Sequence, residues 1–404
     1  MKKLILLGLI VLFVGCPSAP KNSAKIYIER GEYASAKEQL LIGIQQTPDD
    51  YELYCLLAKS EIGLAQWMPA SEAFQRAFDV DSVKTIGWLH KDKNNIPVYW
   101  QSFYNAAVAQ MQEKKYNEAL GNLGFCKILD PTDVNTYILE GGIYNELGKK
   151  TMSDKAYAKA LSIDPENPEA YFLVGKSYFG QKMYDSSLVK FNKAIKYFEV
   201  KYNRIAKPLF QNLPEVDRGL LNEIIDLWID QKNNELDELV KIKLGIDAGL
   251  SAMKGNIERL FKTIDGFARS YYFSGMAYYN LKNYDFALEN LLKTLELMPE
   301  DPDALFYTGE LLIRSKKYQE ALGYFTKITQ LKKKDLYAWF YSAVCYTQLK
   351  DYQKAIDIYE GKVLDIDPKN IDAMTNLAYC YRETGNNKKA LEYLMKAEKL
   401  QKEQ

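Results

Sequence analysis

Residues 281–301 read LKNYDFALENLLKTLELMPED, and this stretch decides the fold. Tyr284 is followed three residues later by Ala287, apolar residues then recur every three or four positions, and Pro299 closes the stretch. That spacing is the period of an amphipathic helix, and proline ends a helix because it lacks an amide hydrogen and clashes with the preceding turn. Residues 31–50, GEYASAKEQLLIGIQQTPDD, show the same order of features. In both places we therefore expect the second helix of a helical hairpin.

The aromatic residue and the alanine recur along the chain, and within runs of neighbouring pairs the step is 34 residues, which indicates a repeat architecture. The pairs are Tyr33/Ala36, Trp67/Ala70, Tyr116/Ala119, Tyr284/Ala287, Tyr318/Ala321 and Tyr352/Ala355. Small residues stand in the first helices, where two backbones must approach closely: Gly141, Gly175, Gly275, Gly309 and Ala343. Because one hairpin cannot bury its own apolar face, successive hairpins are expected to stack.

These residues resemble the tetratricopeptide repeat (TPR) family. The resemblance implies an all-α solenoid, in which helical hairpins form a right-handed superhelix. Nine units are expected, at 17–50, 51–84, 100–133, 134–167, 168–201, 268–301, 302–335, 336–370 and 371–404. They would form an N-terminal array of about five repeats within 16–201, with an irregular connection at 85–99, and a C-terminal array of four repeats within 268–404. Residues 202–267 are expected to be either a helical insert or two degenerate repeats.

The first residues have the pattern of an export signal. Met1 to Lys3 is positively charged and Leu4 to Val14 is apolar, which is too short to span a bilayer comfortably as a mature helix. The segment Phe13-Val14-Gly15-Cys16 resembles the lipobox of bacterial lipoproteins, although Phe13 replaces the usual Leu. The resemblance implies a signal peptide at 1–15 and a lipid on Cys16, which would anchor the chain to the outer membrane or to a membrane surface that faces the periplasm; Pro17 in place of Asp favours the outer membrane.

Composition and motifs favour a protein that is not an enzyme. The 53 basic and 53 acidic residues cancel, so the basic excess typical of nucleic-acid binding is missing. His90 is the only histidine, and it stands in the expected connection without a nucleophile motif nearby. We find no His/Cys metal-ligand spacing and no Gly-rich phosphate loop, and we expect no cofactor. Cys55, Cys126, Cys345 and Cys380 are expected to be buried free thiols.

TPR superhelices usually bind peptides or helices on the concave side, which is lined by one face of the first helices. In this register, residues spaced by four and then three positions share that face of a helix. The candidate groove residues are Tyr104, Met111, Phe172, Phe179, Tyr272, Met276, Tyr279, Phe306, Glu310, Ile313, Phe340 and Tyr379. They are largely aromatic and apolar, which suits an extended peptide or an amphipathic helix. The same side chains could instead pack against the next hairpin.

Two functions remain open at this point. The first is a scaffold or adaptor, lipid-anchored to the bacterial cell envelope, that binds peptide or helix segments of other envelope proteins. The alternative is a ligand-binding component of an envelope transport system, which would use the groove or the insert as an apolar pocket. An enclosed pocket around Trp228 would favour the second function, and an open groove would favour the first.

Overall fold

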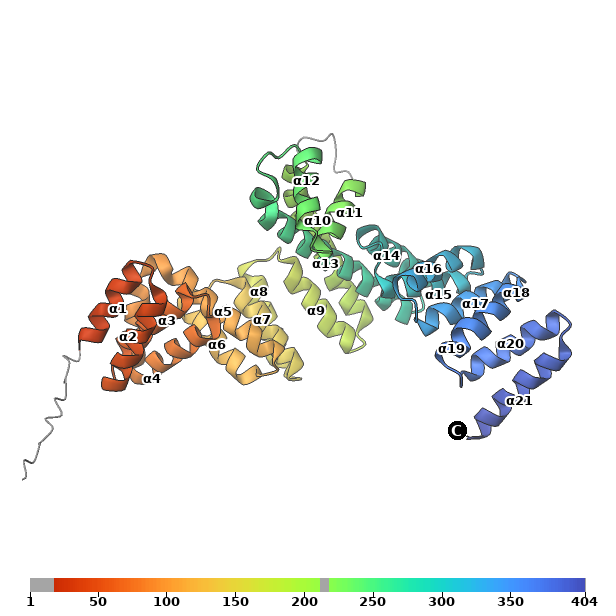
Figure 1. Ribbon diagram of the computed structural model, residues 1–404, viewed down its shortest axis with the longest axis horizontal. Coiled ribbons are helices and arrows are strands. Elements are labelled where there is room, and N and C mark those ends of the chain that lie inside the picture. The colour runs from red at the N-terminus through yellow and green to blue at the C-terminus, as the bar shows by residue number, and fades with distance from the viewer. Residues whose placement is uncertain (1–17, 211–217, 404) are drawn as a thin grey trace, which may run out of the picture. The chain divides into compact units, whose positions relative to one another are not determined.

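The computed structural model describes residues 18–210 and 218–403. These residues form α-helices joined by short turns, with one 3₁₀ segment and one π segment and no strand among them (Figure 1). The predicted all-α fold of helical hairpins is confirmed. The signal peptide at 1–15 and the lipidation residue Cys16 lie outside the described residues. Within 18–210 and 218–403, no helix is both long and apolar enough to cross a membrane.

The chain divides into two compact units, residues 1–165 and 166–404. In the described part of the first unit, four helix pairs follow one another along the sequence. They are α1 (Ala19–Glu29) with α2 (Tyr33–Gln46), α3 (Tyr51–Gly63) with α4 (Trp67–Lys91), α5 (Ile96–Gln112) with α6 (Tyr116–Leu129), and α7 (Val134–Glu146) with α8 (Lys150–Ile163).

The described part of the second unit contains five further pairs and three additional helices. The pairs are α9 (Pro168–Gly180) with α10 (Tyr184–Leu209), α13 (Gly249–Asn280) with α14 (Tyr284–Leu297), α15 (Pro302–Arg314) with α16 (Tyr318–Leu331), α17 (Leu336–Gln348) with α18 (Tyr352–Ile358), and α20 (Ile371–Glu383) with α21 (Asn387–Glu403). A π segment (Tyr359–Val363) and α19 (Leu364–Ile366) extend α18, and they accommodate the one residue by which the unit at 336–370 exceeds the 34-residue step.

Side-chain caps explain where the first helices begin. The residue before α15 is Asp301, whose Oδ1 accepts a hydrogen bond of 2.8 Å from the backbone N–H of Ala304. Asp335 and Asn370 accept equivalent bonds from Ala338 and Ala373. Such a cap satisfies one of the amide groups that have no partner within the helix, so each turn ends where the next helix starts.

Close contact between the two helices of a hairpin depends on the small residue of the first helix. A Cβ atom added at Gly309 would lie 2.7 Å from Cζ of Phe325, and one added at Gly175 would lie 2.6 Å from Cδ1 of Phe191. Both phenylalanines are fully buried. The expectation that these glycines mark a close approach of helices is therefore confirmed.

The structure differs from the prediction at residues 85–99. This stretch is largely helical, because α4 continues to Lys91, a 3₁₀ segment covers Lys93–Asn95, and α5 already begins at Ile96. The helix α4 bends at Asp81, whose backbone angles are φ −155° and ψ 95°. Oδ1 of Asp81 accepts a 3.0 Å hydrogen bond from the N–H of Lys84 and so caps the second segment of α4.

The hairpin at 168–201 groups with the C-terminal hairpins and not with the N-terminal array that was predicted to end at residue 201. The reason is that α10 and α13 are long helices packed along each other, so α9 and α10 stack directly onto α13. Phe273 of α13 illustrates this contact, because its ring lies 5.8 Å from that of Phe172 and 5.9 Å from that of Phe191.

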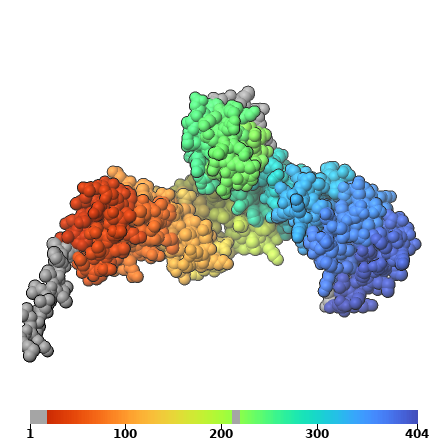
Figure 2. Space-filling model, in the orientation of Figure 1, coloured from red at the N-terminus to blue at the C-terminus, as the bar shows by residue number. Residues whose placement is uncertain are grey.

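Residues 202–267, which were expected to be either a helical insert or two degenerate repeats, are called the insert below. It consists of α11 (Arg218–Ile229) and α12 (Asn233–Lys243), together with the extended ends of α10 and α13 (Figure 1). These four helices share one core, which includes Leu209, Ile224, Leu236 and Leu260. In Figure 2 the green atoms of the insert form a separate knob on the second unit. The turn between α11 and α12 contains one residue with a positive φ, Gln231 at 56°. The turn between α15 and α16 has the same feature at Lys316, whose φ is 60°.

Candidate functional site

The twelve candidate groove residues occupy equivalent places on first helices. Tyr104, Phe172, Tyr272, Phe306 and Phe340 each stand three residues before the small residue of their helix, which in α5 is Ala107. The other candidates follow that small residue by one or four positions, as Met276 and Tyr279 follow Gly275. We call the side of the first helices that carries these positions the first-helix face. The two units are described separately below.

In the first unit, Tyr104 and Met111 pack against the core of their own hairpins. The ring of Tyr104 stacks on that of Trp100 with 4.7 Å between centroids, and burial raises the pKa of Tyr104 to about 12. Met111 lies 3.9 Å from the place where a Cβ on Gly142 of α7 would be. Both residues therefore hold neighbouring helices together.

Two aromatic candidates of α9 meet the following first helix. The ring of Phe172 lies 5.8 Å and that of Phe179 5.4 Å from the ring of Phe273, both edge-on. Such edge-to-face pairs are favourable because the positive edge of one ring meets the negative face of the other. Phe172 is only 9% exposed, so this part of the face is packing between hairpins.

Tyr279 and Glu310 are brought into direct contact across two hairpins. The hydroxyl of Tyr279 donates a 2.8 Å hydrogen bond to Oε1 of Glu310, and Arg314 donates one of 3.2 Å to the same oxygen. The guanidinium of Arg314 lies 4.9 Å above the ring of Tyr284. Burial and the hydrogen bond to Glu310 raise the pKa of Tyr279, so its hydroxyl remains the donor at neutral pH.

Four further candidates are buried or half-buried. Phe306 packs edge-on against Tyr341 at 5.4 Å, and Phe340 against Tyr359 at 6.0 Å. Met276 is 9% exposed, and Ile313 packs against a neighbouring core cluster. These side chains pack beneath the first-helix face, and little of their surface is exposed to solvent.

Two tyrosines project from the face into solvent. Tyr379 is 40% exposed, with the guanidinium of Arg382 5.0 Å from its ring centroid. Tyr337 is 66% exposed and was not among the predicted residues. It stands six residues before Ala343, as Arg269 and Asp303 stand six before Gly275 and Gly309. Extending the predicted pattern by one helical turn toward the start of each helix identifies these three equivalent positions.

One of the predicted residues, Tyr272, lines a cavity of about 330 Å³ between α9, α13 and the start of α15. Its apolar lining includes Phe273 and Met298, and its charged lining includes Lys176, Arg269 and Asp303. Arg269 is paired with Asp265 at 3.0 Å, and Nζ of Lys176 lies 5.8 Å from the ring centroid of Phe273. The arrangement combines aromatic walls with both signs of charge, which suits a peptide better than a single small ion.

The residues that could support catalysis are dispersed. His90 is exposed near the end of α4. The described part of the chain contains no group of three or more His, Cys, Asp or Glu side chains arranged to hold a metal ion. Cys55, Cys126, Cys345 and Cys380 are buried free thiols, as predicted. A depression of about 470 Å³ beside Trp228 is open to solvent, with Ile229 51% exposed, so it is not the enclosed pocket that the alternative function requires.

Comparison with known families identifies the repeats. Family models described as tetratricopeptide repeat match residues 134–167 and 346–403. A model described as anaphase-promoting complex, cyclosome, subunit 3 matches residues 277–362.

A curated relative is the Hsp70-Hsp90 organizing protein of Triticum aestivum, 22% identical over 200 residues that cover 44% of this chain and 34% of the relative. The match therefore spans about a third of that protein's length.

Similar solved structures include YrrB, titled a TPR protein with an unusual peptide-binding site (19% identity, TM-score 0.42, 61% of this chain and 92% of that chain). PilF of Pseudomonas aeruginosa is another (13%, 0.45, 70% and 96%), and MamA of Desulfovibrio magneticus a third (24%, 0.33, 38% and 90%). Repeats of this family generally serve as non-catalytic scaffolds for protein interaction. The repeats matched at 134–167 and 346–403 show that the chain carries tetratricopeptide repeats.

Proposed function

We propose that this protein is a non-catalytic scaffold of the bacterial cell envelope that binds peptide or amphipathic-helix segments of other envelope proteins. The observation that carries the proposal is the cavity at Tyr272, because it joins aromatic walls to charged side chains of both signs on the first-helix face. Exposed aromatic rings are frequent anchors in protein interfaces, and Tyr337 and Tyr379 extend the same face.

The curated relative supports the general role. Its name describes a protein that organizes two others, and the similarity covers 44% of this chain. A scaffold needs no catalytic residues, which agrees with the dispersed His and Cys side chains described above.

The envelope location is the second part of the proposal. The apolar run before Cys16 supports export and lipidation, with the lipid-bearing Cys16 as the first residue of the mature chain. Acyl chains hold a protein at a membrane because each buried CH₂ contributes about 0.8 kcal/mol. Intact mass spectrometry of the protein from a bacterial membrane tests this: we expect a chain that begins at Cys16 and carries acyl groups, and an unmodified chain beginning at Met1 would refute it.

The binding surface is tested with exposed residues, because Tyr279 and Phe306 are engaged within the protein. The variant Tyr337→Ser/Tyr379→Ser removes both projecting rings, and Val189→Ser/Phe286→Ser is the matched control on second helices, where both side chains are also exposed. Envelope proteins are captured with each chain and quantified. We expect the first variant to lose at least 90% of a specific partner and the control to retain it. Equal capture by all chains would refute the proposed surface.

A further inference from the structure

The insert creates a cleft that the repeats alone would not contain. Two cavities lie along α11, one of about 300 Å³ and one of about 390 Å³. Both are lined by Asn222 of α11 and by Leu297 at the end of α14. Because the cavities share these two residues, they form neighbouring parts of one cleft between the insert and the array.

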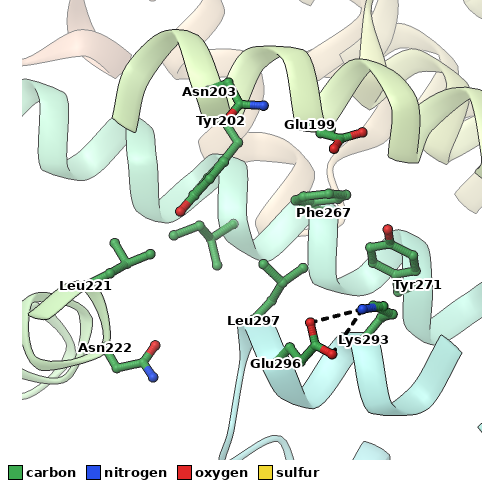
Figure 3. Close-up of a pocket in the computed structure, with 11 residues that line it drawn as sticks. Glu199, Tyr202, Asn203, Leu221, Asn222, Phe267, Tyr271, Lys293, Glu296 and Leu297 are labelled. Carbon is green, nitrogen blue, oxygen red and sulfur yellow. Dashed lines mark hydrogen bonds and ion pairs between the residues drawn. The ribbon is translucent and has the colours of Figure 1, made fainter. Parts of the chain in front are cut away.

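The first cavity has an apolar floor. Leu221 of α11, Ile264 and Phe267 of α13, and Leu297 of α14 line it (Figure 3). Figure 3 shows Tyr202 from α10, Leu221 and Leu297 directed toward a common space. Ile264 is 1% exposed and belongs to the core that joins the insert to α10 and α13, so the floor is fixed by packing beneath it.

The second cavity continues along the same helix. Ile225 and Ile229 of α11 line one side, and Met298, Pro299 and Pro302 line the other, at the turn between α14 and α15. Ile229 is 51% exposed, so an apolar side chain of α11 faces solvent at this end. An apolar group bound here would be stabilised because its surface is removed from water.

The rim of the cleft is acidic. The carboxylates among the described lining residues are Glu199, Asp226, Glu296, Glu300 and Asp301, and the cations among them are Lys293 and Lys327. Lys293 is already paired with Glu296 at 3.0 Å. Glu199, Asp226 and Glu300 form no ion pair with another described residue. Tyr271 lines the side of the first cavity. Its pKa is raised by burial and, after that, by the negative charges of Glu199 and Glu296, so the rim carboxylates act on this wall of the cavity.

We propose that this cleft binds a basic peptide segment of another protein, with one large apolar side chain in each cavity and Lys or Arg side chains at the rim. Two neighbouring cavities, each lined in part by apolar side chains, match two anchor side chains of one segment. The excess of carboxylates favours cationic flanking residues and disfavours anionic ligands such as fatty acids. This site adjoins the cavity at Tyr272, since Met298 and Asp301 line both, but the ligand proposed for it does not depend on the function proposed for the first-helix face.

The test uses the full-length chain and two fluorescein-labelled decapeptides in fluorescence anisotropy titrations. The first probe alternates Leu-Leu and Lys-Lys pairs, and the second has Glu in place of every Lys. We expect the lysine probe to bind and the glutamate probe not to bind. Added salt should weaken the binding, because the rim carboxylates are exposed to solvent and are screened.

Charge reversal locates the site. Glu199→Lys/Glu300→Lys changes two exposed rim carboxylates, and Glu223→Lys/Glu238→Lys makes the same change in charge on insert residues that line neither cavity. We expect the first pair to weaken binding of the lysine probe by about tenfold or more and the control pair by less than about twofold.

Blocking the apolar part is a second, independent test. Asn222→Trp places a bulky ring where the two cavities meet and should abolish probe binding while leaving far-ultraviolet circular dichroism unchanged. Tyr337→Ser/Tyr379→Ser on the first-helix face should leave probe binding unchanged, which separates this site from the proposed scaffold surface. Equal weakening by both charge-reversal pairs, unchanged binding to Asn222→Trp, or equal binding of the glutamate probe would overturn the proposal.

Discussion

Replacing Gly309 by alanine should destabilise its hairpin, although the same change elsewhere in that hairpin should stabilise it. A Cβ at Gly309 would lie 2.7 Å from Cζ of Phe325, whose ring is fully buried. An ordinary contact needs about 3.4 Å or more, so the ring or the helix must shift. Gly323 lies in α16 of the same hairpin, and a Cβ there would meet no atom within 4 Å.

The two substitutions share one favourable contribution. Alanine is favoured over glycine in a helix interior by about 0.8–1 kcal/mol, and this applies to both positions. Overpacking a well-packed core costs typically about 1–3 kcal/mol, and this applies to Gly309 alone. The difference in unfolding free energy between the two variants therefore isolates the overpacking cost.

Amide hydrogen exchange of peptides covering residues 302–331 measures that difference, because a repeat protein opens locally and not in one transition. A cost of about 1–3 kcal/mol corresponds to roughly 5- to 150-fold faster exchange in Gly309→Ala than in Gly323→Ala. If the two variants exchanged at the same rate, the close approach of α15 and α16 at Gly309 would be refuted.

Three further predictions follow from single contacts. Burial opposes ionisation of Glu360, but hydrogen bonds of 2.6 and 2.8 Å from the hydroxyls of Tyr381 and Tyr393 outweigh this effect and lower the pKa of the carboxyl group. The stabilisation of α20 and α21 by the ionised Glu360 is therefore present above about pH 4.3, the ordinary pKa of a glutamate, and is lost as the pH falls further. Exchange of these helices, corrected for intrinsic rates, should accelerate below that pH in the parent and much less in Glu360→Gln; the same acceleration in both would contradict this. Burial raises the pKa of Cys345 to about 12, so iodoacetamide at pH 8 should leave it unmodified until urea is added, and rapid alkylation of the native chain would show it to be accessible. Phe273→Ala should lower the free energy of unfolding by about 2–4 kcal/mol, because the ring joins α9 and α10 to α13. Amide exchange should then be faster in α9 and α10 and unchanged in α20, and unchanged exchange in α9 would argue against that role.

The repeat pattern predicted much of the fold because each hairpin makes the same demands on its residues. Gly309 must be small, and the aromatic and alanine pairs recur because each second helix packs in the same way. The bend at Asp81 could not be recognised from periodicity, since it depends on one side chain capping Lys84. The grouping of residues 168–201 with the C-terminal hairpins depends on Phe273, which lies directly beside the predicted Tyr272 and faces α9.

The candidate site was harder to predict than the fold. Spacing identifies which residues share one side of a first helix, but it does not show whether a ring reaches solvent or the next hairpin. Phe172 was predicted to line a groove and is 9% exposed, whereas Tyr337 on the same helix side is 66% exposed and was missed. The cleft beside α11 depends on how the insert meets Leu297, and no repeat pattern describes that contact.

Site-specific photocrosslinking tests the scaffold function most directly. A benzophenone amino acid is placed at Tyr337 on the first-helix face, or at Phe286 on α14, which is 50% exposed and serves as the control. The full-length chain is irradiated in intact bacteria. The account predicts a discrete protein adduct from position 337 that is missing at position 286. Adducts of the same identity and yield from both positions, or from neither, would contradict the claim that this face holds a partner.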